Sequence, residues 1–261
     1  MKLNIYQIDA FANFSFEGNP AAICPLQEWL PDSLMQSIAE ENNLSETAFF
    51  VPTKKGFHIR WFTPLHEVEL CGHATLASAY VIFNILEYKE AEIEFDSQSG
   101  PLKVRKNNDW LEMDFPSQSP IVCEPPQALL NAFEDRPVET LKFMDYIVVF
   151  ENESSVINAL PDLKSLEELD LRAVIITSKA SEYDFVTRCF APKYGINEDP
   201  VTGSSFTQLV PYWSGKLNKN ILSAKQISKR GGEVKCVYAG ERVKISGKAV
   251  QYMQGVIEVN I

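Results

Sequence analysis

Three ionisable side chains have the types and surroundings that proton transfer needs. They are Glu46, His73 and Asp199, which lie at predicted loop ends or helix starts. Glu46 follows a helix break and precedes an apolar strand, and a carboxyl at the mouth of a pocket has a raised pKa that suits a general base. One such carboxyl can remove a proton from one carbon and return it to another. The alternative for Glu46 is a plain exposed turn residue, which its surroundings alone favour.

The motifs of metal and nucleotide sites are missing from the sequence. His58, His66 and His73 share no ligand spacing, and no cysteine joins them at a recognised interval. The chain has no P-loop lysine motif, no GxGxxG and no G-x-S-x-G elbow. The remaining interpretation is acid–base chemistry with neither a cofactor nor a metal.

The element that must position His73 is the segment Gly72–Phe83, which is nearly apolar on every side. A helix of this kind is buried, and about 12 residues are too few to span a membrane. Its start has free backbone N–H groups and a partial positive charge, which together form a seat for an anion such as a carboxylate. In the alternative interpretation, Gly72 and Thr75 only cap and pack the helix.

The same arrangement occurs twice, close to half a chain length apart. Arg60 precedes Cys71 by eleven residues, and Arg188 precedes Asp199 by the same number. The segment Gly203–Val210 again begins with small residues and continues mostly apolar. Because a repeat indicates duplicated structure, we expect two halves, each with one buried helix whose polar start faces the other half. The N–H groups at the two helix starts would hold a substrate carboxylate.

Cys71 is a second candidate base, because a thiol at a helix start has a lowered pKa. The repeat places Asp199 at its counterpart, so a racemase that uses two thiols is not expected. A buried structural thiol is the interpretation that we prefer for Cys71.

The composition limits the partners and the compartment. The 45% hydrophobic and 23% charged residues are typical of a folded protein. A net charge of −11 argues against a nucleic-acid or anionic-membrane partner, although a small anionic substrate is compatible with it. The first residues lack the apolar core of a secretion signal, and five scattered cysteines without a CxxC pair indicate reduced thiols. We therefore expect a cytoplasmic protein without nucleic-acid or membrane partners.

Many short strands with few helices favour a mixed α+β fold over a doubly wound sheet. Prolines are densest at residues 116–126, which form the best candidate for a linker. We predict an N-terminal half at residues 1–118 and a C-terminal half at residues 119–261, with the final strand crossing back to the first half.

Several groups of residues then follow one another along nearly the whole chain. They are Phe11 with Gly18–Ala22, Ser45–Thr47, Phe62–Pro64 with Cys71–Thr75, Phe190–Pro192 with Glu198–Ser204, and Gln226 and Ser228 with Arg230–Gly232. In these groups the chain resembles the phenazine-biosynthesis PhzF-like isomerase family. The resemblance implies the diaminopimelate-epimerase-like fold, with two similar halves, each a curved sheet around a central helix, and an active site between them.

The resemblance also implies roles for particular residues. In the family's best understood member, a glutamate at the position of Glu46 moves a proton between carbons of a dihydroxy-anthranilate-type acid. His73 and Asp199 would be its polar partners in catalysis. The residues expected to bind substrate are Gly72, Gly203, Ser204, Gly18 and Asn19. Members of the family often form homodimers, and we expect one here.

The chain departs from its relatives at two places. Related epimerases use a cysteine in each half, whereas the second position here is Asp199. Ser205-Phe206 replace the alanine and histidine of many relatives, and this replacement alters either the pocket wall or only the packing. We predict a cofactor-independent isomerase that shifts a proton on a small carboxylic acid. The alternatives are a racemase or epimerase that uses Cys71 with Asp199, and a binding protein of the same fold without chemistry.

Overall fold

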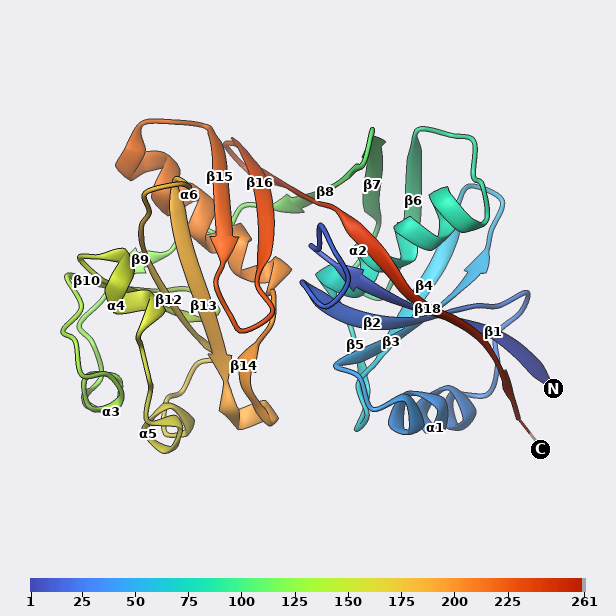
Figure 1. The fold of residues 1–261 in the computed structure, drawn as a ribbon, viewed down its shortest axis with the longest axis horizontal. Helices are drawn as coiled ribbons and strands as arrows, with labels where there is room; N and C mark the ends of the chain where they lie inside the picture. Colours follow the sequence, from blue (N-terminus) through green and yellow to red (C-terminus); the bar gives the residue numbers. More distant parts are fainter. Residues whose placement is uncertain (260–261) are drawn as a thin grey trace. The chain divides into compact units, whose positions relative to one another are not determined.

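The structure is a computed structural model that describes residues 1–259 and consists of two compact units (Figure 1). Unit 1 comprises Met1–Asp114 and the C-terminal segment from Ser246 onward, and unit 2 comprises Phe115–Ile245. Strand β8 (Trp110–Pro116) and strand β17 (Arg242–Gly247) carry the chain from one unit to the other. The sequence-based boundary at residue 118 stands next to this boundary at residue 114.

Unit 1 is a mixed sheet with two helices. Its remaining elements are β1 (Lys2–Ala10), β2 (Asn19–Pro25), α1 (Asp32–Asn42), β3 (Glu46–Pro52), β4 (Phe57–Phe62), β5 (Glu67–Val68), α2 (Gly72–Tyr80) with a π-helical extension η1 (Val81–Ile85), β6 (Glu92–Asp96), β7 (Leu102–Asn107) and β18 (Ala249–Glu258). The strands are ordered β18-β1-β2-β3-β4-β6-β7-β8, with parallel pairs β2–β3 and β4–β6, and β5 pairs with the end of β4.

Helix α2 is the buried helix of unit 1. Residues His73–Ala79 are all buried, and the helix packs against β1, β2 and β3, as Figure 1 shows. The other face of the sheet is covered by α1, whose residues Met35, Ile38 and Ala39 join a core with Phe49 of β3. The prediction that an all-round apolar helix lies in the core is therefore confirmed.

Unit 2 repeats this plan. Its elements are β9 (Ile121–Val122), α3 (Gln127–Ala132), β10 (Glu139–Lys142), β11 (Tyr146–Val149), α4 (Glu153–Ile157), α5 (Leu163–Glu167), β12 (Val174–Lys179), β13 (Phe185–Ala191), η2 (Pro192–Tyr194), β14 (Ile196–Asp199), η3 (Gly203–Ser205), α6 (Phe206–Leu217), β15 (Ile221–Gln226) and β16 (Gly232–Ala239). The strands are ordered β9-β10-β11-β12-β13-β15-β16, with parallel pairs β11–β12 and β13–β15, and β14 pairs with β13. The order of parallel and antiparallel pairs is that of unit 1, so the α+β fold with two similar halves is confirmed.

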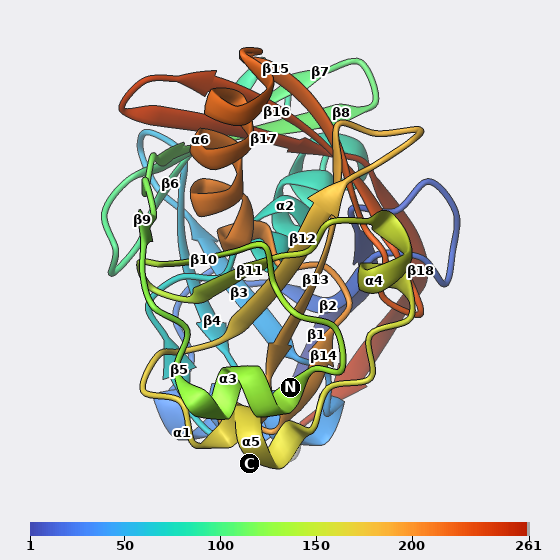
Figure 2. The ribbon, with the colours of Figure 1, turned by 90° about the vertical axis from the view of Figure 1, so that its left-hand side faces the viewer.

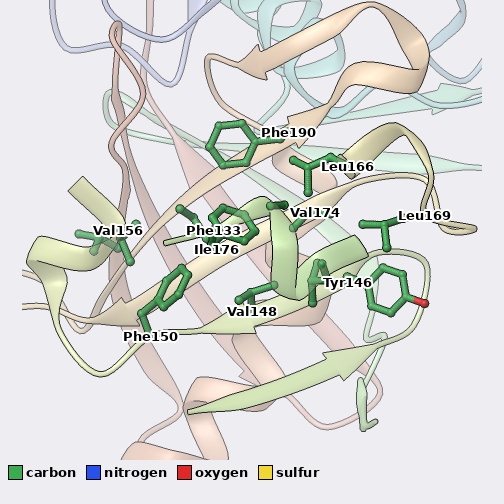
Figure 3. Close-up of a cluster of buried hydrophobic side chains, with 13 residues drawn as sticks. Phe133, Tyr146, Val148, Phe150, Val156, Leu166, Leu169, Val174, Ile176 and Phe190 are labelled. Carbon is green, nitrogen blue, oxygen red and sulfur yellow. The ribbon is translucent and has the colours of Figure 1, made fainter. Parts of the chain in front are cut away.

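The sheet of unit 2 is covered by helices on both faces. Alternate side chains of β11 and β12, such as Val148 and Ile176, pack with Phe133 after α3 and Leu166 of α5 in a cluster of buried hydrophobic residues (Figure 3). The opposite face packs on α6, where Trp213 stacks on Phe185 at a centroid distance of 5.6 Å. Helices α3 and α5 lie side by side (Figure 2). The side chains of β11 and β12 alternate between the two faces because successive side chains of a strand point to opposite sides of the sheet.

The longest α-helix of residues 1–259 is α6, with 12 residues. Among these residues no helix is long and apolar enough to cross a membrane.

Candidate active site

Glu46 is the first residue of β3, opposite Ala21 on the parallel strand β2. The chain reaches Glu46 through a short turn after α1, so the Glu46 side chain lies at the start of the central strand β3. Only 15% of that side chain is exposed. The interpretation of Glu46 as a plain exposed turn residue is therefore wrong.

The imidazole of His73 lies between the Glu46 carboxyl and the Cys71 thiol. Glu46 Oε2 is 3.1 Å from His73 Nε2, and Cys71 Sγ is 3.5 Å from His73 Nδ1. Cys71 is the residue that caps the start of α2, and its carbonyl accepts a 2.6 Å hydrogen bond from Thr75 Oγ1. The start of the buried helix thus fixes the thiol and the imidazole, and β3 brings the carboxyl to them.

The contact between Glu46 and His73 leaves hydrogen-bonding capacity unused. Glu46 Oε2 and His73 Nε2 are both buried, yet the orientation at 3.1 Å does not form an aligned hydrogen bond, and neither atom has another partner among the described residues. Buried polar atoms are nearly always hydrogen-bonded, because leaving one unpaired costs about 1–3 kcal/mol. Each of these two atoms thus has only the other as its close polar neighbour, at 3.1 Å.

The electrostatics favour a charged pair. Burial by itself would raise the pKa of the Glu46 carboxyl, but the charge and contact of His73, together with the Cys71 thiol, lower that pKa below its usual value of 4.5. Burial would lower the pKa of His73, but Cys71 and Glu46 raise it well above 6.5. Glu46 is thus a carboxylate and His73 an imidazolium at neutral pH. The expected raised pKa of Glu46 is wrong, because His73 outweighs burial.

The Cys71 thiol is neutral in this setting. Burial and the nearby Glu46 carboxylate raise its pKa to about 11, although His73 and the backbone N–H of Ala74 act in the opposite direction. The helix start therefore does not lower the thiol pKa as expected, because the thiol is buried beside a carboxylate. This agrees with the preferred interpretation of a structural thiol.

Glu46, Cys71 and His73 also bring three metal-ligating atoms within 4.8 Å of one another. The ring orientation argues against a shared metal, because the thiol faces Nδ1 and the carboxylate faces Nε2. The thiol and the carboxylate thus make their closest contacts with different ring nitrogens, whereas an ion binds one nitrogen of a histidine.

Asp199 ends β14 in unit 2, where a hydrogen-bond network fixes the next turn. Its carboxylate accepts a hydrogen bond from the hydroxyl of Thr202. The fully buried Gln226 donates to the Asp199 carbonyl at 2.7 Å and accepts from the Thr202 N–H at 2.9 Å. Ser228 Oγ donates to the Pro200 carbonyl at 2.7 Å and accepts from the Gly231 N–H, which accounts for the turn after Gln226.

Two arginine–glutamate pairs define which positions of the two units correspond. Arg60 of β4 binds the carboxylate of Glu67 on β5 through two hydrogen bonds, and Arg188 of β13 binds Glu198 on β14 in the same way. The spacing is seven residues in unit 1 and ten in unit 2. The extra three residues are the turn η2 (Pro192–Tyr194).

This insertion corrects the expected counterpart of Cys71. Cys71 follows Glu67 by four residues, and Thr202 follows Glu198 by four. Both residues also take the N-cap position, Cys71 before α2 and Thr202 before η3. The counterpart of Cys71 is therefore Thr202 and not Asp199, because equal spacing from the arginines overlooked the inserted turn.

The correspondence extends to the substrate-binding candidates at the two helix starts. Gly72 corresponds to Gly203, and His73 corresponds to Ser204. In the described part of the chain, the backbone N–H groups of these four residues have no protein acceptor. They are available to an anion in each unit.

Gly18 and Asn19 lie at the start of β2. Gly18 has φ +66°, and a Cβ there would come within 2.1 Å of the Ala10 carbonyl oxygen, so this glycine is required by the backbone. Asn19 is fully buried and pairs with Ala10, two residues before the position opposite Glu46. Their expected role in substrate binding stays a prediction.

The departure at Ser205-Phe206 concerns packing. Phe206 is fully buried and lies 6.2 Å from the ring of Phe185, and Ser205 Oγ donates to the Thr202 carbonyl at 2.7 Å.

Unit 2 contains a buried polar network that was not predicted from the sequence. Asp145, with a fully buried side chain, accepts hydrogen bonds from Arg172 Nε at 2.9 Å, Arg172 Nη2 at 2.7 Å and Gln208 Nε2 at 2.7 Å. Arg172 Nη2 also donates to Ser204 Oγ at 3.1 Å. Burial would lower the pKa of Arg172, but Asp145 raises it. The only sequence signal was a charged residue directly before an apolar strand.

Two hollows lie apart from these groups. One of about 580 Å³ in unit 2 is lined by Val138–Thr140, Tyr212 and Lys216, and one of about 370 Å³ in unit 1 is lined by Tyr80, Asn84, Lys106 and Lys248, among others. Neither contains a predicted site residue, so the candidate site rests on its contacts and charges.

Comparison with known proteins now adds the family. The family model for phenazine biosynthesis-like proteins, PhzC-PhzF, matches residues 8–255. The chain belongs to this family. A Pseudomonas aeruginosa member described as an uncharacterized isomerase is 49% identical over 259 residues, which cover 99% of this chain and 100% of that protein.

Solved structures of the same family have the same fold as this chain. A PhzF-family protein from Enterococcus faecalis superposes with a TM-score of 0.97 at 43% identity, covering 99% of this chain and 100% of that one. A probable proline racemase from Agrobacterium radiobacter, at 9% identity, has a TM-score of 0.64 over 99% of this chain and 93% of its own. The PhzC-PhzF family thus shares its fold with racemases.

Proposed function

We propose that this isomerase of the PhzC-PhzF family moves a proton between carbons of a small carboxylic acid without a cofactor, with Glu46 as both base and acid. The observation that carries the proposal is the buried pair of Glu46 and His73, whose facing atoms lie 3.1 Å apart without an aligned hydrogen bond. The isomerase names of curated relatives support the reaction class.

The charge states suit proton removal. Glu46 is ionised at rest, so it can take a proton from a substrate carbon, and the electron pair of that C–H bond moves into the adjacent unsaturated system of the acid. Glu46, now neutral, returns the proton to another carbon, so that enzyme and proton count are restored. Acid–base catalysis of this kind contributes typically about 10²–10⁴-fold in rate.

His73 assists by its charge. While Glu46 is a carboxylate, the imidazolium balances it; once Glu46 holds the proton, the imidazolium is left opposite the negative charge on the substrate. A fixed positive charge in a buried site stabilises that developing charge more than water would. The free N–H groups at the start of α2 support the same role. The role of Asp199 as a polar partner in catalysis stays a prediction.

The test is proton exchange with solvent. Small carboxylic acids that raise the melting temperature are incubated with the protein in D₂O, and deuterium incorporation is followed by proton NMR. Glu46→Gln is expected to slow exchange at least about 100-fold, while Glu41→Gln, an exposed change on α1, keeps it. Wild-type exchange in the Glu46→Gln protein would exclude Glu46 as the base.

The alternatives give different outcomes in the same assay. A racemase that uses Cys71 with Asp199 would lose exchange in Cys71→Ser; the neutral thiol and the threonine at its counterpart do not support it. A binding protein would show thermal stabilisation by an acid but no exchange with any. A cytoplasmic homodimer without nucleic-acid or membrane partners stays our prediction.

A further inference from the structure

The hollow of about 370 Å³ in unit 1 lies at the opposite end of α2 from the candidate active site. It is lined by Tyr80, the last residue of α2, and by Asn84 of η1, whereas His73 is the second residue of the same helix. At about 1.5 Å per residue, the helix separates His73 from Tyr80 by about 10 Å. Neither Glu46 nor His73 lines the hollow. Its chemistry is therefore separate from the proposed proton transfer.

Three segments of unit 1 form the walls of this hollow. They are the end of α2 with η1, the hairpin of β7 and β8, and the start of β18 with the loop after β1. In the hairpin, Lys106 pairs with Leu111, so both side chains lie on the face that borders the hollow. The start of β18 contributes Lys248. Two lysines from distant parts of the sequence thus line one concave surface.

Backbone contacts fix the position of Lys248. The N–H of Ala12, in the loop after β1, donates to the Lys248 carbonyl at 3.2 Å. The preceding residue, Gly247, allows a close approach to the same loop, because a Cβ there would come within 2.3 Å of the Phe11 ring. The ammonium group of Lys248 lies 5.3 Å from the centroid of the Trp110 ring. The lysine is therefore held at the junction of β8, β18 and the loop.

The end of the buried helix holds the other ammonium group. Lys106 Nζ donates to Asn84 Oδ1 at 2.7 Å and lies 5.8 Å from the centroid of the Phe83 ring. A π-helical turn carries Asn84, and in this turn the Leu86 N–H donates to the Val81 carbonyl at 2.9 Å. Turns of this kind are rare and occur frequently at functional sites.

The two lysines give the hollow an excess of positive charge. Among residues 1–259 neither Lys106 nor Lys248 forms an ion pair, although the chain has 35 acidic and only 24 basic residues. Of the described residues that line the hollow, Asp109 is the only acid, and it lies in the exposed turn between β7 and β8. Two unpaired cations beside one carboxylate favour an anionic ligand.

The size and the neutral polar groups of the walls indicate what the anion is attached to. Small-molecule sites have volumes of about 300–1,000 Å³, and the hollow, at about 370 Å³, falls within this range. The Asn84 amide nitrogen, the Asn108 amide and the Tyr80 hydroxyl have no partner within residues 1–259. Amide and hydroxyl groups of this kind donate to and accept from the hydroxyls of a ligand.

We propose that this hollow binds a phosphate monoester of a small polyhydroxylated compound, with Lys106 and Lys248 on the phosphate. A phosphate monoester carries a charge of about −1.5 to −2 at pH 7, which two ammonium groups balance and a single carboxylate would not. Lysine binds phosphate as a point charge, and hydrogen bonds between opposite charges are about twice as strong as neutral ones. The site is an addition to the proposed function and does not depend on it.

Binding is measured by calorimetry at constant ionic strength. The probes are inorganic phosphate, ribose 5-phosphate and, as the uncharged control, ribose. Ribose 5-phosphate is expected to bind more tightly than inorganic phosphate, and ribose is expected not to bind. In Lys106→Gln/Lys248→Gln the affinity for ribose 5-phosphate is expected to fall at least about tenfold. No binding of ribose 5-phosphate to the wild type, or equal affinity in the double variant, overturns the proposal.

Two further variants separate a built site from general attraction. Lys54→Gln/Lys55→Gln removes the same charge from the exposed turn between β3 and β4 and is expected to keep the affinity. A loss there as large as in the double variant of the hollow overturns the proposal. Asp109→Asn removes the carboxylate from the walls and is expected to tighten binding of ribose 5-phosphate. Weaker binding in this variant contradicts the role of the positive charge.

A last measurement places the phosphate. Lysines are acetylated with acetic anhydride, with and without ribose 5-phosphate, and the peptides are analysed by mass spectrometry. The probe is expected to protect Lys106 and Lys248 but not Lys54. Glu46→Gln is expected to keep the affinity for ribose 5-phosphate, since Glu46 lies at the other end of α2. Protection elsewhere, or loss of affinity in Glu46→Gln, would place the phosphate outside the hollow and overturn the proposal.

Discussion

Removing the Arg172 side chain should destabilise the protein far more than removing a surface cation. In Arg172→Met, the Asp145 carboxylate loses the donors at 2.9 and 2.7 Å and keeps the 2.7 Å hydrogen bond from Gln208. Its side chain is fully buried, so water cannot replace the lost donors. Breaking a buried ion pair from one side costs about 3–5 kcal/mol, and we expect a loss of this size in the free energy of unfolding.

Two further variants test whether the unpaired Asp145 carboxylate causes the destabilisation. Arg172→Met/Asp145→Asn removes both charges, and Gln208 can still donate to the asparagine oxygen, so most of the lost stability should return. Lys2→Met breaks an ion pair with Glu258 whose side chains are 73% and 63% exposed, and it should cost at most about 1 kcal/mol.

The assay is urea unfolding followed by far-ultraviolet circular dichroism. A loss in Arg172→Met no larger than that in Lys2→Met would refute the reasoning. So would a double variant that is as unstable as the single one, because the cost would then come from lost packing and not from the unpaired carboxylate.

Three other predictions concern unit 1. Because the pKa of His73 is raised, the stability that its pairing contributes is fully present below pH 6.5 and is lost as the pH rises through that raised pKa. Because the pKa of Glu46 is lowered, the stability that its pairing contributes is present above pH 4.5 and is lost as the pH falls through that lowered pKa. The stability difference between wild type and Glu46→Gln should therefore be largest near pH 4.5–6.5, and a difference that does not vary from pH 3 to 9 contradicts the charged pair. Gly18→Ala should lower the free energy of unfolding by more than about 2 kcal/mol, as measured by thermal unfolding, since its Cβ would meet a carbonyl oxygen at 2.1 Å. Gly100→Ala has open space around its Cβ and should lower that free energy less. Equal losses in the two variants would rule out the steric explanation. Cys71→Ser should slow proton exchange less than about tenfold because the thiol is neutral, and complete loss would return the thiol to the chemistry.

The elements with a strong local pattern could be predicted. The helix after Cys71 was predicted to be buried because apolar residues surround it, and α2 is buried along His73–Ala79. The spacing of Met35, Ile38 and Ala39 likewise indicates one face of a helix, and these residues are the buried face of α1. Short strands such as β9 (Ile121–Val122) and β5 (Glu67–Val68) were missed, because two residues show no period and their pairing depends on distant partners.

The candidate site was harder to predict because its members are distant in sequence. Glu46 and His73 meet only because β3 begins beside the start of α2, and no local pattern encodes that contact. The family resemblance supplied the pairing of their roles. The counterpart of Cys71 was misplaced because counting residues cannot detect a three-residue turn inserted in one copy. Arg172 was missed since its partners Asp145 and Ser204 lie 27 and 32 residues away from it.

The position of β18 has a consequence for the order of folding during synthesis. This strand pairs with β1 from Lys2↔Glu258 to Ala10↔Ala249, so β1 pairs with a strand that is synthesised after all of unit 2. Until β18 emerges, β1 presents one row of unpaired backbone groups, which is the kind of edge that recruits other strands. Contacts between such distant residues form slowly. Unit 2 is complete in the chain before unit 1 has its last strand, so the unit synthesised second can finish folding first.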